Sequence, residues 1–213
     1  MQQKLQIGNA QHSLGSRLQK FYFNLSYRFG FAEWDVNKPQ PDLIRLVEEG
    51  KIAGKTILDI GCGSGDNAIY LAQKGFQVTG LDYSDKGIEV AKRRAAKENV
   101  TVKFDVADAF NLSNINQQFD IVIDYGLYHN IDMDKMPLYL ENIRQVLKTG
   151  GQFIIQAFGE KSPKQKFAPR QVSETEIRNE FSQNWTVLEI REAVYHATTE
   201  KQIHAILAII QKI

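Results

Sequence analysis

A glycine-rich segment between an apolar run and a helical pattern constrains the fold of this chain more than any other feature. The segment reads Leu58-Asp59-Ile60-Gly61-Cys62-Gly63-Ser64-Gly65-Asp66-Asn67. The apolar run at residues 56–60 is typical of a buried strand, and the pattern at residues 66–74 predicts a helix that stops at Gly75. Glycine lets a ligand approach the main chain, and a helix start offers unpaired N–H groups. The loop is therefore a candidate ligand-binding site.

The rest of the chain beyond residue 40 alternates strand-like and helix-like patterns. We predict strands at residues 56–60, 77–82, 101–105, 119–124, 152–158, 185–194 and 201–210. We predict helices at residues 41–49, 66–74, 85–97, 136–147 and 174–181. The last two strands are too close in sequence for a parallel crossover, so they should pair as an antiparallel hairpin. These patterns predict an α/β fold, a mainly parallel seven-stranded sheet with helices on both faces and a C-terminal antiparallel hairpin.

Length and charge limit the class of protein. The 213 residues suit one domain, in which residues 1–40 form a lid segment and residues 41–213 the core. With 26 Lys and Arg against 25 Asp and Glu, no bulk field favours nucleic acid or an anionic membrane as a partner. The single cysteine, Cys62, excludes an intrachain disulfide and a multi-thiolate metal site. The N-terminal sequence has no signal-like organisation, so we expect a cytoplasmic location.

An acidic residue follows the second predicted strand, at Asp82 in Gly80-Leu81-Asp82-Tyr83-Ser84. A carboxylate at this position can accept hydrogen bonds from a ribose diol, which indicates a nucleotide cofactor. A dinucleotide fingerprint would have its third glycine where Asp66 stands, and Asp59 and Asp66 would repel a pyrophosphate with no nearby cation to offset them. S-adenosylmethionine carries an ammonium and a sulfonium, so electrostatics favours it over NAD.

At these residues the chain resembles the class I S-adenosylmethionine-dependent methyltransferase family, over roughly residues 34–212. Three further segments carry the resemblance: Val106-Ala107-Asp108-Ala109-Phe110, Phe119-Asp120-Ile121-Val122-Ile123-Asp124-Tyr125, and Leu147-Lys148-Thr149-Gly150-Gly151. The last resembles the turn before the fifth strand, with threonine in place of the usual proline. The resemblance implies a Rossmann-like fold, adenine recognition by Asp108 and Ala109, and Tyr125 beside the methionine part of the cofactor. The expected cofactor-binding residues are Trp34, Asp59, Gly61, Gly63, Gly65, Asp82, Tyr83, Asp108, Ala109, Asp124 and Tyr125.

Two local segments resemble small-molecule methyltransferases related to the thiopurine, thiol and halide methylating enzymes. They are Trp34-Asp35-Val36-Asn37-Lys38-Pro39-Gln40-Pro41 and Asp124-Tyr125-Gly126-Leu127-Tyr128-His129, in which Tyr125 replaces a serine. This similarity implies that Trp34 closes over the cofactor and that a small molecule is the methyl acceptor. A thiol, a halide and a heterocyclic thiol are the acceptors that it favours.

The acceptor side is less well defined by the sequence. Aromatic residues are concentrated in residues 21–34, which predicts either a lid over an apolar acceptor pocket or an amphipathic helix packed on the sheet. His129, with Tyr125, is the candidate catalytic residue, a general base for a thiol or hydroxyl; the alternative is a loop histidine bonded to backbone. The basic residues within 161–170 either guide an acidic acceptor or form a solvated loop.

Three other functions are consistent with the same features. A nicotinamide oxidoreductase would share the strand–loop–helix unit, and a non-catalytic cofactor-binding protein would keep the glycine loop. A macromolecular methyltransferase is the third, although no Asp-Pro-Pro-Tyr or Asn-Pro-Pro-Tyr follows the fourth strand. The acceptor atom and the oligomeric state are left open.

Overall fold

The computed structural model describes residues 14–163, 169–197 and 202–213. Its strands are β1 (Thr56–Ile60), β2 (Gln77–Asp82), β3 (Lys103–Val106), β4 (Phe119–Tyr125), β5 (Leu147–Phe158), β6 (Trp185–His196) and β7 (Gln202–Lys212). They form one sheet in the order β3-β2-β1-β4-β5-β7-β6, in which the first five are parallel. Strand β7 pairs antiparallel with both β5 and β6. The predicted α/β fold with its antiparallel C-terminal hairpin is confirmed.

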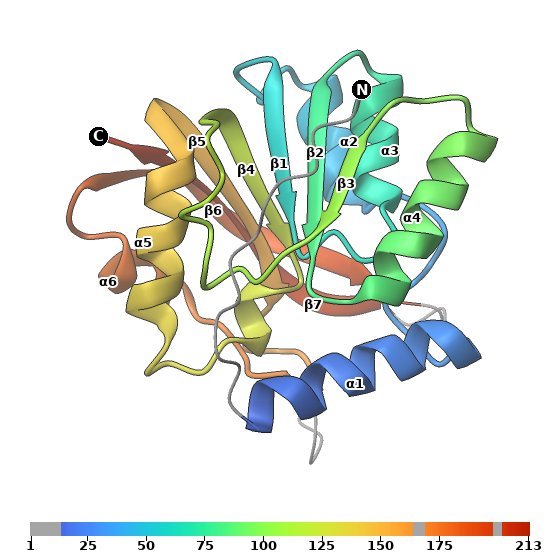
Figure 1. The fold of residues 1–213 in the computed structure, drawn as a ribbon. Coiled ribbons are helices and arrows are strands. Elements are labelled where there is room, and N and C mark those ends of the chain that lie inside the picture. Colours follow the sequence, from blue (N-terminus) through green and yellow to red (C-terminus); the bar gives the residue numbers. More distant parts are fainter. Residues whose placement is uncertain (1–13, 164–168, 198–201) are drawn as a thin grey trace.

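Helices cover both faces of this sheet (Figure 1). They are α1 (Leu14–Phe29), α2 (Pro41–Glu48), α3 (Asp66–Gln73), α4 (Asp85–Lys97), a short 3-10 helix (Tyr128–Asn130), α5 (Met136–Val146) and α6 (Glu174–Glu180). One apolar cluster joins α5 and α6 to the sheet, and a second joins α2, α3 and α4 to the opposite face. Because both faces are covered, the central strands β1 and β4 are buried at almost every position rather than at alternate ones.

Helix boundaries follow the capping signals. Ser173 accepts a hydrogen bond from the N–H of Glu176 over 3.0 Å, as the capping box before α6 predicts. Pro41 stands in the first turn of α2, where a missing N–H costs nothing. One boundary differs from expectation: residues 147–151 are part of β5 and not a separate turn. The pairing of β5 with β4 shifts register there, from Phe119–Leu147 to Ile121–Gln152, and Gly150 in this irregular stretch takes a φ of 77°, which only glycine adopts readily.

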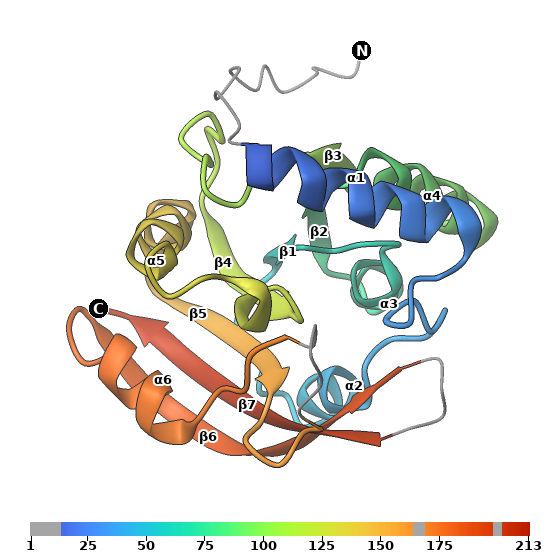
Figure 2. The same cartoon turned by 90° about the horizontal axis from the view of Figure 1, so that it is seen from below.

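The parallel strands place their carboxyl ends at one edge of the sheet, and α1 crosses that edge (Figures 1 and 2). This helix packs against α4 rather than onto the sheet itself, which corrects the expected packing of an amphipathic helix there. Polar contacts hold it: Asn24 Oδ1 accepts from Ser84 Oγ over 2.7 Å, and Lys20 forms an ion pair with Asp85 at 3.0 Å. In the part of the chain that the structure describes, no helix has the length and apolar character to span a bilayer.

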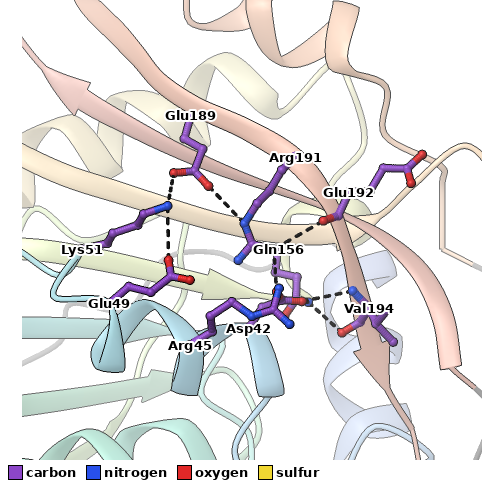
Figure 3. Close-up of polar contacts among 9 residues, drawn as sticks. All are labelled: Asp42, Arg45, Glu49, Lys51, Gln156, Glu189, Arg191, Glu192 and Val194. Carbon is purple, nitrogen blue, oxygen red and sulfur yellow. Dashed lines mark hydrogen bonds and ion pairs between the residues drawn. The ribbon is translucent and has the colours of Figure 1, made fainter.

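An ion-pair network centred on the buried Asp42 joins α2 to the C-terminal hairpin (Figure 3). Arg191 of β6 donates to Asp42 over 2.6 Å, and Asp42 also accepts from the N–H of Val194 over 3.1 Å. Glu189 continues the network, since it accepts from Arg191 over 3.1 Å and from Lys51 over 2.7 Å. These contacts join α2 and the residues after it to β6, which is far away along the chain.

Candidate active site

The glycine loop lies between β1 and α3 and is held by the neighbouring strand. The carbonyl of Leu81 accepts from the N–H of Gly61 over 2.7 Å and from that of Cys62 over 3.0 Å. Gly65 takes a φ of +84°, and a Cβ on it would lie 2.7 Å from the ring of Phe104 and 2.9 Å from Ala91. Any side chain would therefore be strained and would collide with packed neighbours, so glycine is required there.

Asp82 ends β2 and faces the loop. Its Oδ2 accepts from the N–H of Gly63 over 2.8 Å, and its Oδ1 accepts from the N–H of Ser84 over 2.7 Å. Burial raises the pKa of this carboxyl, and the two backbone donors oppose that rise because they stabilise the charged form. Asp82 therefore orients the loop and also presents its remaining lone pairs at the carboxyl edge. Tyr83 follows it, half-buried.

Asp59 lies beneath the loop and carries the clearest sign of a missing partner. Its side chain is 2% exposed, it accepts from the backbone of Ala68, and its Oδ2 is buried without a hydrogen-bond partner. Burial, followed by the nearby charges of Asp124 and Asp82, raises its pKa well above the usual range. A cationic group next to Asp59 would stabilise its charged form and compensate the cost of burying it, so the site fits the ammonium of S-adenosylmethionine.

One electrostatic expectation is wrong. The sequence suggested that no cation lies near Asp66, yet Arg94 of α4 donates to Asp66 Oδ1 over 2.7 Å. The pKa of Asp66 is nevertheless raised to about 6, because burial outweighs the guanidinium. Arg94 was missed because it is 28 residues from Asp66 along the chain and meets it only after α4 packs against the sheet.

An aromatic pair from the N-terminal region contacts the loop through Tyr27. The indole Nε1 of Trp34 donates to the hydroxyl of Tyr27 over 2.8 Å, and the two rings meet edge to face at 6.0 Å. The Tyr27 hydroxyl lies so close to Gly63 that a Cβ there would collide with it. Burial and the charge of Asp82 raise the pKa of Tyr27. The sequence pointed to Trp34 as the cover, but it gave no sign of Tyr27 beyond the general aromatic excess.

Asp108 and Ala109 follow β3 on the same edge of the sheet. Asp108 Oδ1 accepts from the N–H of Phe110 over 2.9 Å, and its side chain is half-buried. Ala109 packs against the apolar cluster under α5. The four loops after β1, β2, β3 and β4 thus bring the glycines, Asp82, Asp108 and Tyr125 to one edge, as the order of the parallel strands requires.

This arrangement agrees with the comparison with protein families. Residues 51–210 match the family described as "Methyltransferase domain". The chain belongs to this family. It is an S-adenosylmethionine-dependent methyltransferase of the Rossmann-like class I fold. Because the family is one of methyltransferases, the cofactor is S-adenosylmethionine and not a nicotinamide dinucleotide.

Two relatives of this methyltransferase are named for small-molecule acceptors, while a third, EEF1A lysine methyltransferase 2 of Homo sapiens, is named for a protein and is 32% identical over 75% of this chain and 64% of its own length. The 2-heptyl-1-hydroxyquinolin-4(1H)-one methyltransferase of Mycobacteroides abscessus is 36% identical over 77% of this chain and 73% of its own length. A probable thiol methyltransferase 2 of Arabidopsis thaliana is 28% identical over 69% of this chain and 66% of its own length. A solved structure from work on the conversion of a disulfide bond into a thioacetal group during echinomycin biosynthesis has a TM-score of 0.82, with 29% identity and 91% coverage of both chains.

Asp124 of the methyltransferase, which we expected to contact the cofactor, forms its hydrogen bonds within the protein. It is fully buried, and its Oδ1 accepts from the N–H groups of Leu127 at 2.7 Å and Tyr128 at 3.1 Å. Its Oδ2 accepts from the hydroxyl of Tyr139 over 2.6 Å. Because both oxygens are engaged by the protein, Asp124 shapes the turn after β4 and does not present a free carboxylate to the cofactor. Burial raises its pKa to about 6.

Tyr125 points to the other face of β4. Its ring belongs to the apolar cluster under α2, α3 and α4, and its hydroxyl is buried without a hydrogen-bond partner. Burial raises its pKa, with a further contribution from the charge of Asp42. The side chain therefore stays a neutral phenol, which suits contact with an apolar or cationic group and not proton abstraction.

His129 is buried in the 3-10 helix after β4. Its Nδ1 accepts from the N–H of Phe158 over 3.0 Å, and its ring lies 4.2 Å from the ring of Phe158. Burial, with the nearby charge of Arg170, lowers its pKa to about 3. Because Nδ1 accepts, the neutral ring carries its proton on Nε2, which can donate a hydrogen bond but cannot take a proton. The geometry thus matches the alternative of a histidine bonded to backbone.

The basic segment at residues 161–170 is divided between described and undescribed residues. Arg170 pairs with Glu176 at 2.6 Å and donates to the carbonyl of Tyr128 over 3.2 Å, so it fixes the loop to α6 and the 3-10 helix. Lys161 is paired with Glu192. Lys164 and Lys166 lie outside the described residues. Both described cations are neutralised within the fold, which does not favour capture of an acidic acceptor by them.

Proposed function

We propose that this chain transfers the methyl group of S-adenosylmethionine to a small-molecule acceptor, of which a thiol, a halide and a heterocyclic thiol are the first to test. The observation that supports the proposal is the aromatic pair: Tyr27 lies against Gly63 and is bonded to Trp34, and we infer that the two rings enclose the donor crevice. An enclosed crevice suits a small acceptor better than an extended polymer. The names of the hydroxyquinolone and thiol methyltransferases agree with this class of acceptor.

The chain's own residues would hold the cofactor from four sides. Asp82 accepts from the ribose hydroxyls, while Asp108 and Ala109 recognise the adenine with side chain and backbone. The glycine loop leaves room for the chain of the methionine part, and Asp59 stabilises its ammonium. When bound, the sulfonium supplies an electrophilic methyl group. Trp34 and Tyr125 lie at that end of the crevice in this proposal, and residues 1–40 act as the lid.

For His129 the proposed role is that of a hydrogen-bond donor to the acceptor and not that of a general base. Methyl transfer to an acceptor that is already anionic requires alignment and exclusion of water, and it requires no protein base. His129 would then donate from Nε2 to the acceptor and orient it. The neutral phenol of Tyr125 would contact the donor end of the crevice as a packing surface.

The test is formation of S-adenosylhomocysteine with a panel of thiols, iodide and bromide, heterocyclic thiols and a hydroxyquinolone. Turnover with one class identifies the acceptor. Calorimetry on the same protein measures cofactor binding independently. Binding without turnover on any acceptor would contradict small-molecule transfer and leave the non-catalytic or macromolecular alternative. The cytoplasmic location and the oligomeric state stay open to fractionation and to light scattering.

A further inference from the structure

We propose that Arg94 is a positioning residue that clamps the Trp34 cover onto the glycine loop. It lies in the last turn of α4, it is not among the residues assigned to the cofactor above, and no sequence motif singled it out. The inference rests on the proposed function, because it assumes that the cofactor occupies the crevice under Trp34.

Arg94 contacts two separate segments at once, the segment that carries Asp35 and the glycine-rich loop with the start of α3. Its Nη1 donates to Asp35 Oδ1 over 2.7 Å and its Nη2 donates to Asp35 Oδ2 over 3.1 Å, so the guanidinium holds that carboxylate with two parallel bonds. Nη1 also lies 2.7 Å from Ser64 Oγ in the glycine loop and 2.7 Å from Asp66 Oδ1 at the start of α3. Ser64 Oγ donates in turn to Asp35 Oδ1 over 2.8 Å. The cover segment and the loop thus share one hub.

The hub is shielded from solvent, unlike most ion pairs of this protein. The side chains of Arg94, Asp35 and Asp66 are 23%, 17% and 15% exposed, and Ser64 is buried. By contrast, Lys86 and Glu89, an ion pair on the same helix, are 42% and 53% exposed. Partly buried, two-pronged pairs are screened less by salt and water than exposed ones, so this cluster can hold a segment in place.

Asp35, which Arg94 holds, is adjacent in sequence to Trp34 and so links the ion pair to the aromatic cover. Trp34 immediately precedes Asp35, and its indole is bonded to the hydroxyl of Tyr27, which lies against Gly63. The N–H of Asp35 donates to the carbonyl of Ala32 over 2.9 Å, which fixes the turn that carries the indole. Fixing Asp35 therefore fixes the position of Trp34 relative to the loop.

The charges of this cluster predict what the loss of Arg94 would do. Asp35 and Asp66 both point at the guanidinium, so they are two carboxylates around one cation. Without Arg94 they would face each other as like charges, and the cover segment would be repelled from the loop. A lysine at this position would keep the charge but lose the two-pronged geometry. We therefore expect Arg94→Gln to release the cover and Arg94→Lys to release it partly.

The test uses Trp34 as a reporter. The chain has two tryptophans, so Trp185→Phe leaves Trp34 as the only indole. In that background, acrylamide quenching without cofactor measures the exposure of Trp34, and calorimetry measures the affinity for S-adenosylhomocysteine. We expect Arg94→Gln to increase the quenching constant at least twofold and to weaken binding by about tenfold, as the loss of charge-assisted hydrogen bonds would do.

The matched control is Arg178→Gln, which removes the exposed pair with Glu174 on α6 and should change neither quantity. Circular dichroism and thermal unfolding confirm that each variant is folded. If Arg94→Gln does not fold, Asp35→Asn removes the other partner of the same ion pair and should increase quenching in the same way.

The possible outcomes distinguish failure of the proposed role of Arg94 from failure of the proposed function. Quenching that is unchanged in a folded Arg94→Gln or Asp35→Asn variant would overturn the clamp. Increased quenching with unchanged affinity would also overturn it, because the cover would then not matter to the cofactor. Absence of S-adenosylhomocysteine binding by the parent Trp185→Phe protein, with intact quenching differences, would contradict the proposed function and leave the clamp as a contact of the fold.

Discussion

The backbone N–H of Gly63 donates to Oδ2 of Asp82 over 2.8 Å, so the middle of the glycine loop is held by the residue expected to bind the ribose. The same carboxylate also accepts from Ser84, at the start of α4. One side chain thus aligns the loop after β1 with the loop after β2. Loop geometry and ribose recognition therefore depend on one residue.

Replacement of this residue tests the cofactor site. We expect Asp82→Ala to weaken S-adenosylmethionine binding by at least tenfold, because the hydrogen bonds to the ribose and the support of Gly63 are both lost. Asp105→Ala is the matched control, since Asp105 lies on the adjacent strand β3 and accepts from the N–H of Val106. Calorimetry measures both variants. Unchanged affinity in a folded Asp82→Ala protein would remove Asp82 from the site.

Asp124 predicts a pH dependence of stability. Its pKa is raised from 3.8 to about 6 in the folded protein, so the folded state binds more protons than the unfolded state between these values. The free energy of unfolding contributed by this group therefore increases as the pH falls from above 6 toward 4, by an amount on the order of 3 kcal/mol.

Asp124→Asn removes this contribution while keeping an acceptor for the N–H groups of Leu127 and Tyr128. Urea unfolding of both proteins at several pH values gives the difference between them. That difference should shift in favour of the wild type as the pH falls below 6. A difference that does not vary with pH would show that Asp124 titrates normally.

His129 predicts the absence of a pH effect. Since its pKa is lowered to about 3, the ring stays neutral above pH 4. The pH profile of kcat/KM for a thiol acceptor should then follow ionisation of the thiol, with no limb near pH 6.5. His129→Asn can keep a hydrogen-bond acceptor for the N–H of Phe158, so a loss of activity in this variant would not be due to loss of that bond. His129→Ala leaves that N–H unpaired and should cost about 1–3 kcal/mol of stability.

The ion pair of Asp42 and Arg191 predicts a large structural effect. Arg191→Ala would leave the buried carboxylate of Asp42 facing the more distant and exposed Arg45, at 3.6 Å, and we expect the free energy of unfolding to fall by about 1–3 kcal/mol. Lys161→Ala is the control, because its pair with Glu192 is exposed on both sides and its loss should leave stability unchanged. Equal effects of the two substitutions, measured by chemical denaturation, would contradict a buried anchor between α2 and the hairpin.

The sequence by itself determined the fold class, the antiparallel hairpin and the position of the glycine loop. These features depend on local signals: periodicity of apolar residues, glycines at a strand-to-helix junction, a capping box at Ser173 and Glu176, and a connection too short for a parallel crossover. Parallel strand order then brings the loop ends to one edge, so Asp82, Asp108 and Tyr125 could be expected near one another.

Only the tertiary structure decided which side chains meet. Arg94 contacts Asp35 across 59 residues, and Arg191 contacts Asp42 across 149. The N–H of Phe158 occupies Nδ1 of His129 across 29 residues, which removes the base that the sequence allowed. Local periodicity places a residue on a face, but the partner of a buried charge depends on how distant elements pack, because burial penalises every polar group left without one.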